Sequence, residues 1–563
     1  MKTKTPAIFI GILFFTGCQN LKEVDTTVYM DPSRPVEERV EALLEQMTLE
    51  EKIGQMDMVS EWDQDSIMKA GYYDFGAWIA GQEPEAANLL QSFSEKTRLK
   101  IPYLIGMDAA HGYATLQGRT VYPTSVSMAA TFNRSLTEQA ARKAAAEIRS
   151  AGTHWTFAPC VDIVCDARWG RTGETYGEDP FLASEMVRAA VKGLQDNPDP
   201  AKRVAASVKH LAAGGVSTGG VNHASAEISE RFLRSYILPP FKAAVEAGCM
   251  TIMPGHNDIG GIPCHASRWL LTDVVKGEFG FGGFFISDMM DMDNLTSLHF
   301  TAENQSQALE KSINAGMDMH MYSPDSLQFA VPVRQLVREG KIPMSRIDDA
   351  VRRILKVKFS LGLFENRYTD PAADRYATPD SRRTALEAAR ECVVLLKNEG
   401  NLLPLDTTKY RRILVTGPNA DNQAILGDWS FTQPDSCVVT VLEGMRRTAD
   451  GTGAGARGNG QAGSGCHRQR ETAQQRMDHR PRAGHRRRVG TGYVRRTGCG
   501  GNSLWQSESF GKDAGDRAQT CRTDPDVLLS GGVQILDGLR AGKLARGRQA
   551  RFLLRTRTEL HLV

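Results

Sequence analysis

Eight short apolar runs recur along the first 365 residues and alternate with stretches of helical periodicity. The runs are IGQMDMV (53–59), GAWIA (76–80), PYLIGMD (102–108), WTFAPCVDI (155–163), AASVKH (205–210), CMTIMP (249–254), GFFISD (283–288) and AGMDMHM (315–321). Apolar runs without regular alternation are typical of strands that are buried on both faces. Eight strand–helix units in succession predict an α/β fold, namely a parallel (β/α)8 barrel of the TIM type.

The predicted barrel covers residues 30–365, and the amphipathic helix at 345–364 would close it. A polar linker is expected at 366–384. Residues 385–445 then predict the start of an α/β sandwich domain that remains incomplete, with a helix followed by a strand in RRILVTGPNA (411–420).

The last segment, residues 446–563, differs in composition from the rest of the chain. It contains 21 Arg against 2 Lys, mixed with Gly, Gln, Thr and Ser. It has no convincing helical or strand period, which predicts disorder. The abrupt onset resembles translation of GC-rich DNA in a shifted frame. A basic nucleic-acid-binding arm is the alternative, but the net charge of the whole chain is only +2, so we expect no nucleic-acid partner.

The amino terminus predicts a targeting segment. Lys2 and Lys4 precede the apolar run PAIFIGILFF, and FTGC places Cys18 after a small residue. The run is short for a membrane span, so residues 1–18 are interpreted as a signal peptide. A cysteine at the cleavage point resembles a bacterial lipobox. We therefore expect an exported protein, either periplasmic or anchored to the outer membrane through lipidated Cys18, with plain secretion as the alternative.

Polar and charged residues follow several of the predicted strands. Each alone has a structural explanation, such as helix capping or a surface ion pair. Together, at the carboxyl ends of barrel strands, they predict a pocket for a polyhydroxylated ligand, because such side chains bind hydroxyl groups. The sequence shows no metal-ligand spacing and no phosphate-binding glycine motif, so no metal or cofactor is expected. The motifs are GMDAAHG, CDARWGRTGETYGEDP, SVKHLAAGG, MPGHNDIGG and GFFISDMMDMDNL.

Four stretches, in this order and at these spacings, resemble glycoside hydrolase family 3, the β-glucosidase/β-xylosidase type: GMDAAHG, FAPCVDIVCDARWGRTGETYGEDP, SVKHLAAGG and GFFISDMMDMDNL. The resemblance covers roughly residues 30–445 and implies that Asp288 is the catalytic nucleophile. It further implies that a set of side chains holds the non-reducing sugar: Asp108, Arg168, Lys209, His210 and Trp429. His256 is expected to line the same subsite, although an aromatic residue often occupies its position, and Met289 stands where Trp is frequent.

The implied activity is that of a retaining, exo-acting β-glycosidase, which releases glucose or xylose from β-linked oligosaccharides or aryl glycosides. The acid/base of the family is a Glu beyond residue 445, and Glu508 is the candidate for this role. One alternative is a β-N-acetylglucosaminidase of the same family, although that branch carries KHFPGHG where this chain has KHLAAGG. A second alternative is a catalytically impaired, sugar-binding lipoprotein that lacks the acid/base.

Overall fold

The computed structural model describes most of the chain from residue 24 to residue 449 and two short strands near the carboxyl end. The predicted signal peptide, Cys18 and Glu508 lie outside the described residues. No helix among the described residues has both the length and the apolar character needed to cross a membrane. The described residues are 24–60, 64–71, 73–81, 83–322, 327–373, 375–406, 409–410, 412–449, 552–555 and 559–562.

Eight parallel strands form one sheet in the order β10-β1-β2-β3-β4-β5-β6-β9. Every predicted strand run contains or overlaps one of them, which confirms the predicted barrel. Their bounds are β1 Asp57–Ser60, β2 Ala77–Ile79, β3 Leu104–Met107, β4 Trp155–Thr156, β5 Ala205–Leu211, β6 Thr251–Pro254, β9 Phe284–Phe285 and β10 His320–Met321.

Backbone hydrogen bonds join the two ends of this sheet. Ile286, directly after β9, pairs in parallel with Met319, directly before β10. The N–H of Met319 donates to the Phe285 carbonyl at 2.9 Å, and the N–H of Ser287 donates to the Met319 carbonyl at 3.0 Å. The sheet therefore closes into a ring, and closure leaves no strand edge unpaired.

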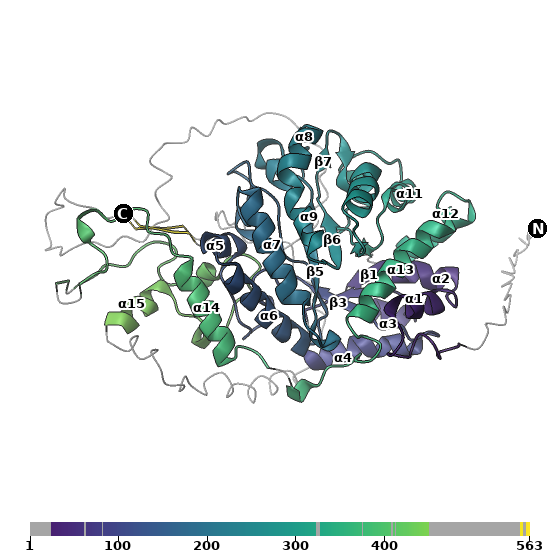
Figure 1. The fold of residues 1–563 in the computed structure, drawn as a ribbon, viewed down its shortest axis with the longest axis horizontal. Helices are drawn as coiled ribbons and strands as arrows, with labels where there is room; N and C mark the ends of the chain where they lie inside the picture. The colour runs from purple at the N-terminus through teal and green to yellow at the C-terminus, as the bar shows by residue number, and fades with distance from the viewer. Residues whose placement is uncertain are drawn as a thin grey trace, which may run out of the picture.

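Helices α5–α7 lie on one side of the strands and α1, α2, α12 and α13 on the other (Figure 1). Helix α2 begins at a capping box, in which Thr48 and Glu51 each bond the other's backbone N–H. The bounds are α1 Val36–Leu44, α2 Leu49–Gln55, α3 Gln64–Ala70, α4 Pro84–Ser92, α5 Ser125–Ala130, α6 Arg134–Ser150, α7 Pro180–Gln195, α8 Glu230–Phe232, α9 Pro239–Glu246, α10 Asn294–Ser297, α11 Gln305–Ala315, α12 Leu327–Arg338 and α13 Met344–Ser360. A small antiparallel pair, β7 Asp258–Ile259 and β8 Ile262–Pro263, lies in the loop after β6.

Large side chains fill the barrel interior. Trp155 of β4 is fully buried and contacts Phe157 and Phe284 edge-on, with ring centroids 5.1 and 5.3 Å apart. Its indole N–H donates to Thr251 Oγ1 at 2.8 Å, so its polar atom is satisfied. The barrel interior around Trp155 is thus a packed core. We therefore expect the reacting residues in the loops at the carboxyl ends of the strands.

The region after the barrel has the predicted helix but not the predicted strand. Helix α14 spans Pro379–Glu391 and α15 spans Val441–Ala449. Residues 412–420 form only a single-residue bridge at Ile413, because no neighbouring described strand extends the ladder. Within residues 446–563 the described residues comprise the end of α15 and an antiparallel pair, β11 (Phe552–Arg555) and β12 (Glu559–Leu562).

Candidate active site

Asp288 lies three residues after the end of β9; two contacts hold its carboxylate, and a third holds its backbone N–H. Its Oδ1 accepts the N–H of Met289 at 2.7 Å, and its Oδ2 lies 3.1 Å from His256 Nε2. Its own backbone N–H donates to His265 Nε2 at 3.2 Å. Only 17% of the side chain is exposed. The strand end thus presents one oriented, largely buried carboxylate to the mouth of the barrel.

His256, in the loop after β6, lies between two carboxylates. Its Nδ1 is 2.7 Å from Asp291 Oδ2, and its Nε2 faces Asp288. Burial lowers the pKa of His256, but Asp288 and Asp291 outweigh burial and raise this pKa to about 9. Burial likewise raises the pKa of Asp288, and the His256 cation overcomes it, so the pKa of Asp288 lies below its usual range. At neutral pH the pair is therefore an imidazolium and a carboxylate.

Lys209 of β5 and Asp108, directly after β3, form a second buried ion pair. Their Nζ and Oδ1 atoms are 2.6 Å apart, and both side chains are largely enclosed. Burial lowers the pKa of Lys209, but Asp108 more than compensates and raises it. The Lys209 ammonium also lies 5.4 Å from the ring centroid of Trp429, within cation–π range. The pair places a fixed positive charge and a fixed carboxylate side by side.

His210 is oriented by Asp162 and Arg171. Its Nδ1 is 2.8 Å from Asp162 Oδ2, and Arg171 Nη2 approaches its Nε2 at 2.9 Å. Arg171 is always a donor, so we assign the neutral tautomer with the proton on Nδ1. Burial, followed by the charge of Arg171, lowers the pKa of His210 well below its ordinary value, in agreement with this tautomer. The 3.7 Å approach of His210 Nε2 to Asp288 is therefore not an ion pair.

The structure does not bring Arg168 to this group. Its side chain is 73% exposed and pairs with Asp166 at 2.7 Å. Arg171, three residues further on, is the buried arginine, and it binds both carboxylate oxygens of Glu174 at 2.9 and 3.0 Å. The predicted placement of Arg168 is thus corrected to Arg171: the chain turns after Trp169, so the two arginines point to different environments.

A loop of the region after the barrel lies against the barrel mouth. The Asp428 carbonyl is 2.6 Å from His111 Nε2, and the N–H of Phe431 donates to the Ala114 carbonyl at 2.9 Å. Gln433 Nε2 also donates to that carbonyl, at 3.1 Å. These contacts position Trp429, 39% exposed and with a left-handed φ of 57°, beside Lys209.

Sequence reasoning missed several residues that complete the group. Asp162 lies in the predicted strand 155–163 without an assigned role, and Asp291 is one of several acids in the motif GFFISDMMDMDNL. His265 belongs to no motif. Two features of the sequence could have pointed to the missed residues. They are the pair of arginines in RWGR and the two closely spaced acids in SDMMD. Tertiary contacts decide which member of each pair faces the pocket.

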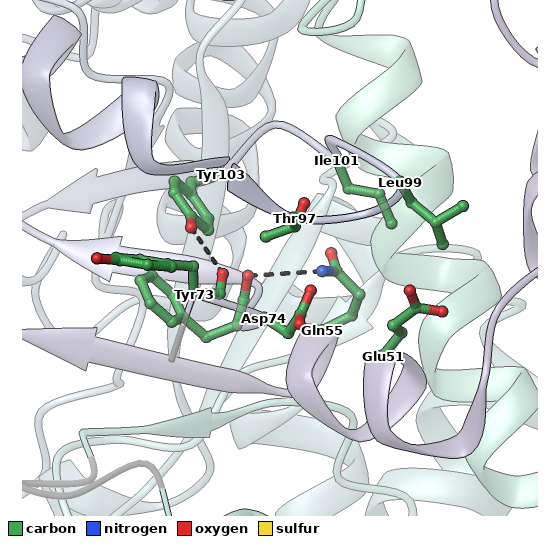
Figure 2. Close-up of a pocket in the computed structure, with 9 residues that line it drawn as sticks. Glu51, Gln55, Tyr73, Asp74, Thr97, Leu99, Ile101 and Tyr103 are labelled. Carbon is green, nitrogen blue, oxygen red and sulfur yellow. Dashed lines mark hydrogen bonds between the residues drawn. The ribbon is translucent and has the colours of Figure 1, made fainter. Parts of the chain in front are cut away.

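The pocket in Figure 2 lies elsewhere and is not the sugar site. Gln55 of α2, and Phe75 and Tyr103, which precede β2 and β3, line it. Tyr103 Oη donates to the Tyr73 carbonyl at 2.7 Å across it. These residues precede the strands, whereas Asp108 and Asp288 follow them. The pocket therefore belongs to the amino-terminal end of the barrel.

Several curated relatives resemble this chain over much of its length. A "Beta-xylosidase" of Formosa agariphila is 33% identical over 462 residues, which cover 78% of this chain and 58% of the relative. A "Periplasmic beta-glucosidase" of Salmonella typhimurium is 35% identical over 429 residues, covering 73% of this chain and 54% of the relative. The chain thus spans little more than half the length of these relatives.

Solved structures show the same relationship. A β-glucosidase from Erythrobacter marinus matches with a TM-score of 0.71 at 34% identity, covering 76% of this chain and 58% of that one. A β-glucosidase from Listeria innocua in complex with glucose matches with a TM-score of 0.67 at 32% identity, covering 73% and 58%.

Two family models match the chain in succession. The glycosyl hydrolase family 3 N-terminal domain matches residues 48–357, which contain the whole barrel sheet and Asp288. The family 3 C-terminal domain matches residues 393–530, a span that begins in the loop region after α14. Together with the barrel and the motifs at its mouth, these matches show that the chain belongs to glycosyl hydrolase family 3.

Proposed function

We propose that the chain acts as a retaining, exo-acting β-glycosidase that releases glucose or xylose from the non-reducing end of β-linked oligosaccharides. The observation that carries the proposal is the ionised Asp288 carboxylate at the end of β9, paired with the His256 cation. The names of the relatives, β-xylosidase and periplasmic β-glucosidase, support this substrate class.

In the proposed first step, a carboxylate oxygen of Asp288 attacks the anomeric carbon. The bond from that carbon to the leaving oxygen breaks, and its electron pair goes to the leaving oxygen. Water then attacks the same carbon and loses a proton to solvent, while the bond to Asp288 breaks and its electron pair returns to the carboxylate. An ionised nucleophile is required for the first step, and the low pKa of Asp288 keeps it ionised at neutral pH.

The proposed sugar-holding residues are Asp108, Lys209, His210, Arg171 and Trp429. Asp108 and Lys209 supply a charged acceptor and charged donors, which suit vicinal hydroxyl groups. Arg171 takes the role expected of Arg168, because it alone of the two is buried beside His210. Trp429 offers an aromatic face at the entrance. His256 takes the position beside the nucleophile.

The described carboxylates around Asp288 offer no unengaged acid to protonate the leaving group. Each carboxylate described around Asp288 already contacts a cation or a histidine: Asp108, Asp162, Glu174 and Asp291. This observation favours the second candidate, a sugar-binding protein with impaired turnover, unless a residue beyond 449 supplies the acid. Glu508 stays a prediction.

The decisive experiment uses a 2,4-dinitrophenyl 2-deoxy-2-fluoro-β-glucoside, whose good leaving group requires no protonation. The full chain should release dinitrophenolate once and carry one fluoroglucosyl group on the peptide that contains Asp288, detected by mass spectrometry. A label on another residue, or none, contradicts the proposal. Comparison of cellobiose with dinitrophenyl β-glucoside then separates the candidates, because only the missing acid predicts near-zero cellobiose turnover with azide-accelerated release of the trapped sugar.

We also propose export and lipidation at Cys18. The periplasmic location named for the Salmonella typhimurium relative supports export, and the FTGC sequence supports the anchor. Cys18→Ser should abolish partition into the detergent phase of a Triton X-114 separation, while Cys165→Ser, a control at an exposed barrel-loop cysteine, should not. Unchanged partition of Cys18→Ser contradicts the anchor.

We also propose four parts of the chain: a barrel at 30–365, a linker at 366–384, the start of the second domain at 385–445 and an out-of-frame tail from 446. The closed strand ring and α13 support the first limit. The C-terminal family match extends to residue 530 and so overlaps the proposed tail. Resequencing the gene around codon 445 tests the frame directly, and limited proteolysis should cut after about 445 before it cuts the barrel.

A further inference from the structure

Two imidazole rings face the same oxygen of Asp288. His256 Nε2 lies 3.1 Å and His210 Nε2 lies 3.7 Å from Asp288 Oδ2. All three atoms lie within 4.8 Å of one another. Three donors bound to one first-row metal ion at about 2.0–2.2 Å would lie about 3.3–3.5 Å apart, so small side-chain shifts would bring them into coordination range.

The second nitrogen of each ring is already held by a buried carboxylate. His210 Nδ1 is 2.8 Å from Asp162 Oδ2, and His256 Nδ1 is 2.7 Å from Asp291 Oδ2. Metal-binding histidines almost always have such a carboxylate partner, because it fixes the ring and makes the free nitrogen a better ligand. Each ring thus has one nitrogen directed at Asp288 and the other held by a carboxylate, as in a metal site.

We propose that His210, His256 and Asp288 bind a divalent transition metal, Zn²⁺ or Cu²⁺, in competition with substrate. Two imidazoles and one carboxylate suit these ions better than Mg²⁺ or Ca²⁺. A tetrahedral ion held by these three ligands would take a water as its fourth ligand. The inference deepens the proposed function, because the same carboxylate would serve as nucleophile. Sequence spacing did not predict this site, since the ligands come from β5 and from the loops after β6 and β9.

Binding requires two local exchanges. His256 Nε2 gives up its proton to solvent and donates its electron pair to the metal. His210 Nε2 leaves its hydrogen bond with Arg171, whose guanidinium keeps its two bonds to Glu174. Asp288 then shares an electron pair with the metal and cannot attack the anomeric carbon. The metal is therefore an inhibitor, and the reaction itself does not need it.

The binding test uses the full chain and needs no turnover. Calorimetric titration with Zn²⁺ should give one saturable site, and Co²⁺ should give the visible absorption bands of a four- or five-coordinate ion. His256→Phe and Asp288→Asn should each weaken Zn²⁺ binding at least about tenfold. His223→Phe is the matched control: this ring lies beside His256, with ring centroids 4.6 Å apart, but belongs to no ligand group in the described structure, so its variant should bind Zn²⁺ like the parent.

Where dinitrophenyl β-glucoside is hydrolysed, Zn²⁺ should raise KM, leave kcat unchanged, and lose its effect on addition of EDTA. If no turnover occurs, the function proposal fails while the calorimetry still decides the metal site. The metal proposal is overturned if binding does not saturate, or if folded His256→Phe and Asp288→Asn both bind Zn²⁺ as tightly as the parent protein. Inhibition that changes kcat alone also contradicts it.

Discussion

Similar apolar sequences are buried in the barrel but exposed in the region that follows it. In the barrel, Phe284 and Trp155 are fully buried, and each strand pairs on both sides. After the barrel, Leu395 and Leu396 in VVLLKN are 57% and 59% exposed. Helix α15 has a strongly one-sided apolar face, yet none of its residues is buried. An apolar run therefore becomes a strand only where neighbours complete its ladder.

This difference follows from topology. A barrel closes on itself within one stretch of chain, so its strands satisfy their backbone groups without help from later residues. An open sheet depends on every strand that builds it, and among the described residues of 393–449 no ladder forms. The later region nevertheless touches the chemistry, because its loop at 426–433 lies against the barrel mouth.

The sharpest test of where the chemistry lies is Asp288→Ala. Loss of the attacking carboxylate should reduce turnover of dinitrophenyl β-glucoside by about 10⁴-fold or more. The melting temperature should change little, because Asp288 lies at the barrel mouth outside the packed core. Asp166→Ala, which removes the exposed partner of Arg168, should keep ordinary activity. Ordinary activity of purified Asp288→Ala would show that the barrel mouth is not the reacting centre.

A pair of stability variants measures the contrast in burial. Phe284→Ala removes a fully buried ring and should lower the free energy of unfolding by about 3–5 kcal/mol, whereas Leu395→Ala should cost less than about 1 kcal/mol. Urea unfolding monitored by circular dichroism provides both values. Equal losses would mean that Leu395 is buried in solution and that the two regions are packed alike.

The junction at which β10 closes the strand ring is the seam of the barrel. Its contribution to stability should depend on pH because of His320 of β10. Burial lowers the pKa of His320, but Asp293 at 2.9 Å and Asp57 outweigh it and raise this pKa to about 9. A group whose pKa rises on folding stabilises below its unfolded pKa of 6.5 and loses this contribution as pH rises through 9. The shift corresponds to at most about 3 kcal/mol.

Melting temperature should therefore fall between pH 6.5 and 9 in the parent protein, and fall less in His320→Gln. Parallel pH profiles for the two proteins would show that His320 does not stabilise the seam as a cation. The control is His299→Gln, which removes a histidine outside the seam that contacts the backbone of His256.

The smallest expected effect concerns the contact between the two regions. His111→Ala removes the bond to the Asp428 carbonyl and should loosen Trp429, raising KM for an aryl β-glucoside about tenfold, equivalent to about 1.4 kcal/mol. Gln433→Ala removes two other hydrogen bonds between the same loop and the barrel, to the backbone of Ala114 and Gly118. It should raise KM in the same way. If His111→Ala lowers kcat while Gln433→Ala changes nothing, His111 acts in the chemistry rather than in docking.

The sequence by itself determined the barrel and the carboxylate at its mouth. Eight apolar runs separated by helices allow few arrangements, since parallel strands need helical crossovers and place their carboxyl ends together. That logic located Asp288, Asp108, Lys209 and His210 at one end. It also predicted a helix at 382–398, because periodicity is a local signal, although the structure places this helix at Pro379–Glu391 and so begins it within the predicted linker.

Only the tertiary structure decided which neighbours share the pocket. Arg168 and Arg171 are indistinguishable in RWGR, yet one turns to solvent and the other to His210. Asp162, Asp291 and His256 meet their partners across 35 to 48 residues of chain. The strand expected at 411–420 is missing for the same reason. Side-chain direction and ladder completion depend on residues distant in sequence, whereas periodicity and caps depend on residues within one turn.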